Sequence, residues 1–210
     1  MALKEVAENI LTSPLLASIG SVEHGFGTRF CDLSQQHMAA VRQVHSARCL
    51  IVDSPGTAGE GDALLTAQPG LAVSVRTADC LPILLADPER PAVAAVHAGW
   101  RGTAARIVQQ AVAAMEREFG TNPAQLVAAI GPGIGVCCYQ VGEDVARQFE
   151  LHGAGRVDLA EENRRQLQEA GVRDARIDLL GLCTFCDRRF HSWRRDKEQA
   201  GRMISFIKAG

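Results

Sequence analysis

The sequence lacks any long apolar run. No stretch approaches the ~18 consecutive apolar residues that a membrane-spanning helix needs. The opening segment MALKEVAENILTSPLLASIG is mildly apolar, but Lys4, Glu5, Glu8 and Asn9 interrupt it, and it lacks the basic start and apolar stretch of a signal peptide. We therefore expect a cytoplasmic protein that has no membrane partner.

A strong charge imbalance is also missing. The formal net charge is -2 at pH 7, so the composition gives no reason to expect nucleic acid as a partner. Apolar residues make up 47% of the chain and charged residues 22%, which is ordinary for a globular protein. No repeat or low-complexity linker interrupts the 210 residues, and we expect a single domain spanning residues 1–210.

Histidine is scarce, and no His-x-His pair occurs. The six histidines are dispersed, whereas a multicopper centre needs many, so copper-dependent phenol oxidation is not expected. The seven cysteines are an odd, scattered set, and without an export signal we interpret them as reduced thiols. No Gly-Lys-Ser/Thr follows the glycine-rich stretch AAIGPGIGVCCYQVGED, so this loop is not a P-loop.

Short apolar runs are abundant and predict strands. They lie at residues 48–53, 71–76, 81–87, 92–97, 126–131 and 175–182. Most are continuously apolar rather than alternating, which is typical of strands buried on both faces. Strands and helices do not alternate strictly, and we therefore predict an α+β protein with mixed sheets covered by helices.

Three segments predict helices. One runs from Thr103 to about Phe119, with its apolar residues on one stripe and Gly120 as the C-terminal stop. The second covers residues 142–150. The third covers residues 159–171, with Asp158 as the N-cap.

Three metal-ligand residue types end strand-like runs. His45, Cys80 and His97 each terminate such a run and precede a break in it. Two imidazoles and one thiolate would form a zinc site with an open position, which is the arrangement of catalytic zinc. No local spacing rule supports the set, and two hydrogen-bonded histidines with a buried cysteine remain the alternative.

Further polar residues lie near these breaks. Asp62, in EGDALLT, is a candidate general acid or base, with a solvated turn aspartate as the alternative. Arg101 opens the long helix, whose free N–H groups suit an anion such as phosphate, although it could equally be solvated. Gly99 and Gly102 would let the chain bend sharply into that helix.

The remaining cysteines and arginines give weaker signals. Cys183 and Cys186 form a C-x-x-C pair, but a structural zinc site needs further ligands, and only His191 is a candidate. Cys137 and Cys138 are adjacent, which disfavours both as ligands of one metal, and we interpret them as packing residues. Arg194 and Arg195 follow an aromatic residue in HSWRRD, where they either bind an anion or line a surface.

Together these motifs resemble a known family from about residue 22 to the C-terminus. The chain is similar to the multicopper polyphenol oxidase (laccase-like) family, whose bacterial members are also called purine nucleoside phosphorylases or peptidoglycan editing factors. The matching motifs, in order, are HGFGTR, RQVHS, GDALLT, RTADCLPILLAD, VHAGWRG, IGPGIGVCCYQVG and HSWRRDKEQAGRMISFI.

The resemblance implies a layered α/β/β/α sandwich with mixed sheets. It implies a metal site, usually read as zinc with copper also attributed to the family, at residues matching His45, Cys80 and His97. The implied reactions are phosphorolysis of adenosine, inosine and methylthioadenosine, and deamination of adenosine. The segment CDLSQQHMAAV departs from the family, which usually places Gly-Gly-Val-Ser and Ser-Leu-Asn-Leu-Gly stretches and a helix there.

These expectations lead to three hypotheses. In the first, the protein is a zinc-dependent purine nucleoside enzyme whose partners are purine nucleosides and phosphate. Asp62 moves the proton, and Arg42, Arg101 and Arg194 hold the phosphate. In the second, Cys80 is the nucleophile of a metal-free Cys-His hydrolase acting on a peptide or cell-wall precursor, with His97 as a candidate base. In the third, the protein only binds a nucleotide or a partner. We expect a monomer or weak homodimer.

Overall fold

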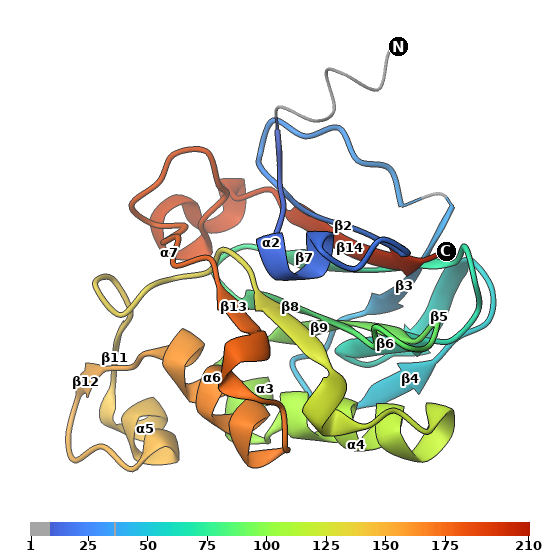
Figure 1. Cartoon of the computed structure of the whole chain (residues 1–210). Helices are drawn as coiled ribbons and strands as arrows, with labels where there is room; N and C mark the ends of the chain where they lie inside the picture. Colours follow the sequence, from blue (N-terminus) through green and yellow to red (C-terminus); the bar gives the residue numbers. More distant parts are fainter. Residues whose placement is uncertain (1–8, 36) are drawn as a thin grey trace.

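Two six-stranded sheets face each other in the computed structural model, which describes residues 9–35 and 37–210 (Figure 1). Sheet A has the order β1 (Ile10–Leu11), β2 (Val22–Gly27), β14 (Met203–Ala209), β7 (Ala72–Thr77), β3 (Met38–Arg42) and β5 (Gly56–Glu60). Sheet B has the order β13 (Ile177–Leu179), β10 (Val127–Ile130), β8 (Leu81–Ala86), β9 (Val93–Ala98), β6 (Ala63–Thr66) and β4 (Cys49–Ile51). A small sheet pairs β11 (Gln140–Val141) with β12 (Gly155–Arg156).

Both large sheets are mixed, as predicted. In sheet A, β3 runs parallel to β5 and β7, and in sheet B, β4 is parallel to β6 and β10 to β13; the other pairs are antiparallel. Every residue of β8 and β9 is buried. Sheet A covers one face of these strands and helices cover the other. Both faces are therefore buried, which accounts for the continuous apolar runs.

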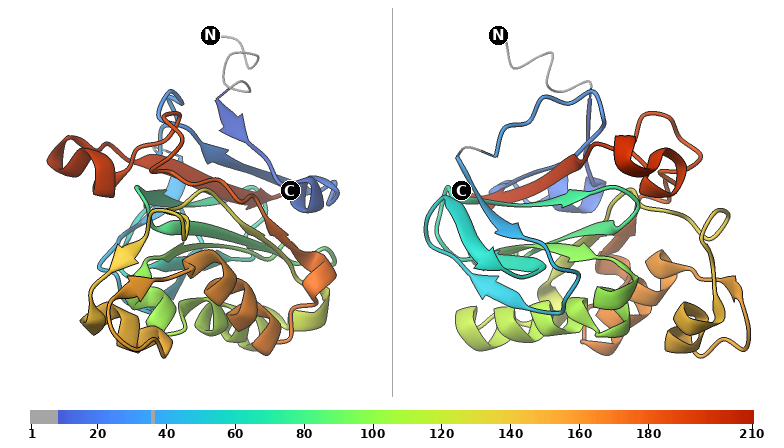
Figure 2. Two further views of the ribbon diagram at one scale, coloured as in Figure 1. Left: turned by 90° about the vertical axis from the view of Figure 1, so that its left-hand side faces the viewer. Right: turned by 180° about the vertical axis from the view of Figure 1, so that it is seen from behind.

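The longer helices lie on the outer face of sheet B (Figure 2). They are α3 (Trp100–Ala104), α4 (Ile107–Phe119) and α6 (Leu159–Glu169). Short elements complete the described chain: α2 (Pro14–Ala17), α5 (Glu143–Ala146), α7 (Trp193–Asp196) and single 3-10 turns at Pro123–Gln125, Arg147–Phe149, Asp174–Arg176 and Lys197–Gln199. No helix among the described residues is long and apolar enough to cross a membrane.

The long helix predicted from Thr103 to Phe119 is two helices. Arg106 adopts a left-handed backbone with a φ of 60°, and α3 ends before it while α4 begins after it. The guanidinium of Arg106 hydrogen-bonds to Gln109 and Glu169, which holds the junction. The sequence does not reveal this break because arginine and alanine are good helix formers. Gly120 ends α4 as expected, with a φ of 68°.

The other helix predictions fare differently. Asp158 caps α6 as predicted, since its side chain accepts hydrogen bonds from the backbone N–H groups of Ala160 and Glu161. The helix expected at residues 142–150 is only α5 followed by a 3-10 turn, which ends at Glu150 in a left-handed conformation. This segment therefore serves as a short connection rather than as a layer of the fold.

Candidate active site

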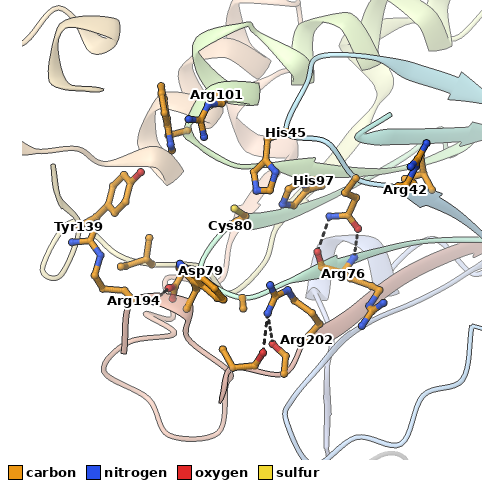
Figure 3. Close-up of a pocket in the computed structure, with 18 residues that line it drawn as sticks. Arg42, His45, Arg76, Asp79, Cys80, His97, Arg101, Tyr139, Arg194 and Arg202 are labelled. Atoms are coloured by element: carbon orange, nitrogen blue, oxygen red, sulfur yellow. Dashed lines mark hydrogen bonds between the residues drawn. The ribbon is translucent and has the colours of Figure 1, made fainter. Parts of the chain in front are cut away.

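Two turns and one strand bring His45, Cys80 and His97 together (Figure 3). His45 lies after β3 of sheet A, Cys80 lies between β7 of sheet A and β8 of sheet B, and His97 belongs to β9 of sheet B. Their ligand atoms all lie within 4.8 Å of one another, and the two imidazole rings are 4.9 Å apart at 78°. The three residues thus converge where the two sheets meet.

The backbone is strained at this convergence. His45 has a φ of 60°, and Asp79, next to Cys80, has a φ of 80°. Each such conformation costs a non-glycine residue about 1–3 kcal/mol, and it persists only where the surroundings enforce it. Here the N–H of His45 donates a hydrogen bond to Asp62 Oδ1 at 3.0 Å, which fixes the turn that presents the imidazole.

Asp62 lies behind the three residues and organises them. Its carboxylate is fully buried and accepts a hydrogen bond from His97 Nδ1 at 2.8 Å. It also accepts hydrogen bonds from the backbone of Val44, His45 and Ser46 and from the Ser46 hydroxyl. Burial alone would raise the pKa of Asp62, but hydrogen bonds from His97 and Ser46 lower it to about 2.

The predicted role of Asp62 as a proton shuttle stays a prediction, and its contacts also give it a positioning role. The carboxylate is fully buried and faces the cluster through its hydrogen bond to His97 Nδ1. This hydrogen bond fixes the orientation of the imidazole, as the outer partner of a metal-binding histidine does.

Cys80 and His97 shift each other's pKa in opposite directions. Burial would raise the pKa of the Cys80 thiol, yet hydrogen bonds from His45 and His97 lower it to about 6. Burial would likewise lower the pKa of His97, yet hydrogen bonds to Asp62 and Cys80 raise it to about 9. The lowered thiol pKa favours the thiolate, which is the form that binds metals and attacks electrophiles.

Gly99 and Gly102 have a different role from the predicted sharp bend. Neither has a positive φ, and Gly99 is extended at the start of α3. A Cβ on Gly99 would lie 2.9 Å from Cys80 Sγ and 3.2 Å from His45 Cδ2. A Cβ on Gly102 would lie 3.2 Å from the carbonyl oxygen of Ser46. Gly99 thus leaves room for the side chains of Cys80 and His45, and Gly102 leaves room for the backbone next to His45.

A pocket of about 950 Å³ opens over the three residues. Its lining includes five arginines: Arg42, Arg76, Arg101, Arg194 and Arg202. Three aromatic side chains also line it: Trp100, Tyr139 and Trp193. The volume lies within the range of about 300–1,000 Å³ that is typical of small-molecule sites.

The three arginines predicted to bind phosphate all line this pocket, but their side chains have different partners. Arg42 forms a 2.5 Å ion pair with Glu60, which partly neutralises it. Arg101 is exposed and stacks over the Trp100 ring at 4.3 Å. Arg194 lies 5.4 Å from the centre of the Tyr139 ring and donates to a backbone carbonyl. Arg101 and Arg194 are therefore the better anion-binding candidates.

Asp79 supports the wall that carries Arg194. Its carboxylate accepts hydrogen bonds from the Thr184 hydroxyl and from the backbone N–H of Arg194, both at 2.6 Å. Four further residues line the pocket that no sequence pattern predicted: Arg76, Tyr139, Trp193 and Arg202. Nothing in their local pattern marks them, because they come from a strand, a short helix and two loops that only the tertiary fold brings together.

A second cluster of ligand atoms also corrects an earlier interpretation. The sulfur atoms of Cys137, Cys138, Cys183 and Cys186 lie within 4.8 Å of one another. Cys137 is exposed, so it is not a packing residue as predicted, and the C-x-x-C pair has two further thiols beside it. The adjacency of Cys137 and Cys138 concealed this arrangement in the sequence.

The fold and the site together define an α+β protein with a metal-ligand cluster in an arginine-lined pocket. Residues 27–210 match the family model described as multi-copper polyphenol oxidoreductase laccase. The chain belongs to this family.

Similar proteins carry two kinds of name. A purine nucleoside phosphorylase of Deinococcus radiodurans is 44% identical over 179 residues, which cover 80% of this chain and 69% of that protein. Adenosine deaminase RL5, from an unknown prokaryotic organism, is 36% identical over 191 residues, covering 79% of this chain and 72% of its own. Several curated relatives are matched over less than two thirds of their own length, as little as 58% among these.

Solved structures support the same fold. The crystal structure of YlmD from Geobacillus stearothermophilus superimposes with a TM-score of 0.86 at 28% identity, covering 94% of each chain. The layered α+β architecture with mixed sheets is thereby confirmed. The family and the relatives' names together support a metal-dependent, nucleoside-processing family.

Proposed function

We propose that this protein is a zinc-dependent purine nucleoside enzyme that cleaves adenosine, inosine and methylthioadenosine with phosphate and deaminates adenosine. One observation carries the proposal: His45, Cys80 and His97 converge within 4.8 Å at the pocket that five arginines line. The names of the relatives, which include both a phosphorylase and a deaminase, point to the same two reactions.

The donor set fits zinc. Two imidazoles and a thiolate are borderline and soft ligands, and three protein ligands are typical of a catalytic zinc site. The bond from His97 Nδ1 to Asp62 adds the outer partner that zinc-binding histidines usually have. When bound, zinc supplies Lewis acidity to the pocket. Copper would fit the same ligands, but six dispersed histidines argue against a multicopper centre.

Different pocket residues would bind different parts of the substrates. Arg101 and Arg194 would bind the phosphate, because guanidinium groups match its oxygens with paired N–H donors. Trp100, Tyr139 and Trp193 offer flat apolar surfaces for the purine. In phosphorolysis a phosphate oxygen forms a bond to ribose C1′ as the bond from C1′ to the base nitrogen breaks. In deamination water adds at C6 and ammonia leaves.

The direct test is incubation of the zinc-loaded protein with adenosine, with and without phosphate. We expect adenine and ribose 1-phosphate in the presence of phosphate, and inosine in both reactions. The Cys80→Ala variant should lose both activities, while Cys31→Ala, whose thiol lies away from the pocket, should keep them. Absence of all these products from a protein that binds zinc would reject the proposal.

A metal-free Cys-His hydrolase is the second candidate, including one that edits a peptidoglycan precursor. The lowered pKa of Cys80, about 6, and the raised pKa of His97, about 9, favour it because they give a thiolate beside an imidazolium. Chelation separates the two functions. The hydrolase would keep its activity without metal and lose it on alkylation of Cys80, whereas the nucleoside enzyme would lose activity on chelation alone.

A further inference from the structure

Four cysteine sulfurs form a cluster apart from the pocket. Cys137 and Cys138 lie in the loop between β10 and β11, and Cys183 and Cys186 lie in the loop between β13 and α7. None of them is among the described residues that line the large pocket. Cys137 and Cys186 are exposed and the other two are half-buried, so the cluster is reachable from solvent.

The spacing of the sulfurs suits one central ion. Cys186 Sγ lies 3.3 Å from Cys138 Sγ and 3.8 Å from Cys137 Sγ, and all four sulfurs fall within 4.8 Å of one another. Tetrahedral zinc with bonds of about 2.3 Å to sulfur places its sulfur ligands about 3.8 Å apart. A disulfide would join only two sulfurs, at about 2.05 Å, and would not explain why all four converge.

The backbone around the sulfurs is arranged as a metal-binding loop requires. The N–H of Gly135 donates to Cys183 Sγ at 3.2 Å, a contact that stabilises charge on a thiolate. A Cβ on Gly135 would lie 3.2 Å from Cys183 Cβ and 3.3 Å from Cys137 Sγ, so the backbone passes directly beside the sulfurs. A bridge between Gly133 and Cys183 aligns the two loops.

We infer that Cys137, Cys138, Cys183 and Cys186 bind one zinc ion, which is structural and separate from the His45–Cys80–His97 site. Four thiolates fill a tetrahedral zinc ion and leave no position for a substrate, which is the pattern of structural zinc. The bound ion joins two loops that reach the pocket. Tyr139 follows Cys138 directly, and Thr184 follows Cys183 and hydrogen-bonds to Asp79 beside Cys80.

Zinc content tests this site independently of the first. Zinc-loaded wild-type protein should hold about two zinc ions per chain, and Cys80→Ser and Cys137→Ser/Cys186→Ser about one each. Cys31→Ser is the matched control and should keep the wild-type content. If zinc binds at the four-cysteine site alone, Cys80→Ser should keep the wild-type zinc content and Cys137→Ser/Cys186→Ser should hold none. That result would support this inference and contradict the proposed zinc site at Cys80. Equal zinc in the wild type and the double variant would overturn the inference.

Cobalt identifies the ligands. Cys80→Ser titrated with Co²⁺ should show intense sulfur-to-cobalt charge-transfer absorption and tetrahedral bands, and an added Cys183→Ser change should abolish the tetrathiolate spectrum. No thiolate absorption in Cys80→Ser would overturn the inference.

Alkylation of the wild-type protein covers the case in which the variants misfold. Zinc should protect Cys137 and Cys186, which are exposed, and a chelator should make both reactive. Rapid alkylation of both thiols in zinc-loaded protein would contradict a metal site, as would a disulfide between Cys138 and Cys186 found by peptide mapping of protein prepared without oxidant.

Discussion

Asp62 shows how one buried side chain can shape a site that it does not enter. It accepts a hydrogen bond from His97 and hydrogen bonds from the turn that holds His45, so it connects two of the three ligands. The carboxylate is fully buried, so it influences the pocket through the residues that it hydrogen-bonds. Its effect on function should therefore be seen first in metal binding.

Asp62→Asn should weaken zinc binding by roughly 10–100-fold, because the amide no longer holds His97 in the required tautomer with the same strength. Competition with a chromophoric chelator measures this. Asp53→Asn is the matched control, since Asp53 is exposed. Unchanged zinc affinity in Asp62→Asn would show that the carboxylate serves the fold alone.

Gly99→Ala should also reduce zinc binding, by at least about tenfold, because the new methyl group would approach Cys80 Sγ to 2.9 Å and force the ligands apart. Gly20→Ala is the control, because nothing lies within 4 Å of the added carbon. Isothermal titration of both variants with zinc measures the two affinities. If the two variants bind zinc equally, the close packing at Gly99 is not essential.

Arg101→Ala should raise the KM for phosphate by roughly 10–100-fold, since a charge-assisted contact is worth about 1.5–3 kcal/mol. Arg42→Ala should have a smaller effect, because Arg42 is already paired with Glu60 at 2.5 Å. Initial rates at varied phosphate concentration measure both. The reverse order of effects would assign the phosphate to the Arg42 side of the pocket.

At the scale of elements, α6 supports α3 through buried polar contacts. Gln166 of α6 donates to the carbonyl oxygen of Thr103 at 2.9 Å, and Asn163 donates to the Thr103 hydroxyl at 2.9 Å. Thr103 lies in the short helix that carries Arg101. The position of Arg101 thus depends on a helix far along the chain.

Gln166→Ala should lower the free energy of unfolding by about 0.5–1.5 kcal/mol, because it removes one of the two hydrogen bonds that the Thr103 carbonyl accepts, the other coming from the backbone N–H of Arg106. Gln168→Ala is the control, because that side chain is exposed on the same helix. Urea denaturation followed by circular dichroism gives both values. Equal stabilities would mean that water replaces the lost donor.

The sequence predicts strands such as β8 and β9 well, because burial on both faces selects for continuous apolar runs. It does not predict β5 or β14, which have no such run. It also selects His45, Cys80 and His97, which all end such runs. It fails at Arg106, whose left-handed backbone is imposed by partners distant in sequence. It fails likewise for the four cysteines, whose loops meet only through the pairing of β10 with β13.

At the scale of the whole molecule, the two sheets are connected through His24. His24 in sheet A accepts a hydrogen bond from the Ser13 N–H at 2.8 Å, and the Ser13 hydroxyl donates to Asp178 in sheet B at 2.5 Å. Burial lowers the pKa of His24 below its usual 6.5. The folded protein therefore favours the neutral ring, whose lone pair accepts the Ser13 hydrogen bond.

Stability should fall as the pH drops through about 6.5, because the unfolded chain then takes up a proton that folded His24 resists. The contribution is fully present above that pH. His24→Gln cannot titrate and should therefore lose less Tm than the wild type between about pH 7.5 and about pH 5.5. His152→Gln, at an exposed position, should behave as the wild type. Identical pH profiles for all three proteins in differential scanning calorimetry would exclude this role.

The position of His45, Cys80 and His97 has a consequence for the lifetime of the protein. His45 follows a strand of sheet A, His97 lies in sheet B, and Cys80 lies in the turn that passes from one to the other. A metal held by all three fastens the sheets together, and at 100 times its Kd it adds about 2.7 kcal/mol to global stability. Chains without metal would unfold more often and be cleaved by proteases. The supply of metal would therefore set the amount of this protein as well as its catalytic rate.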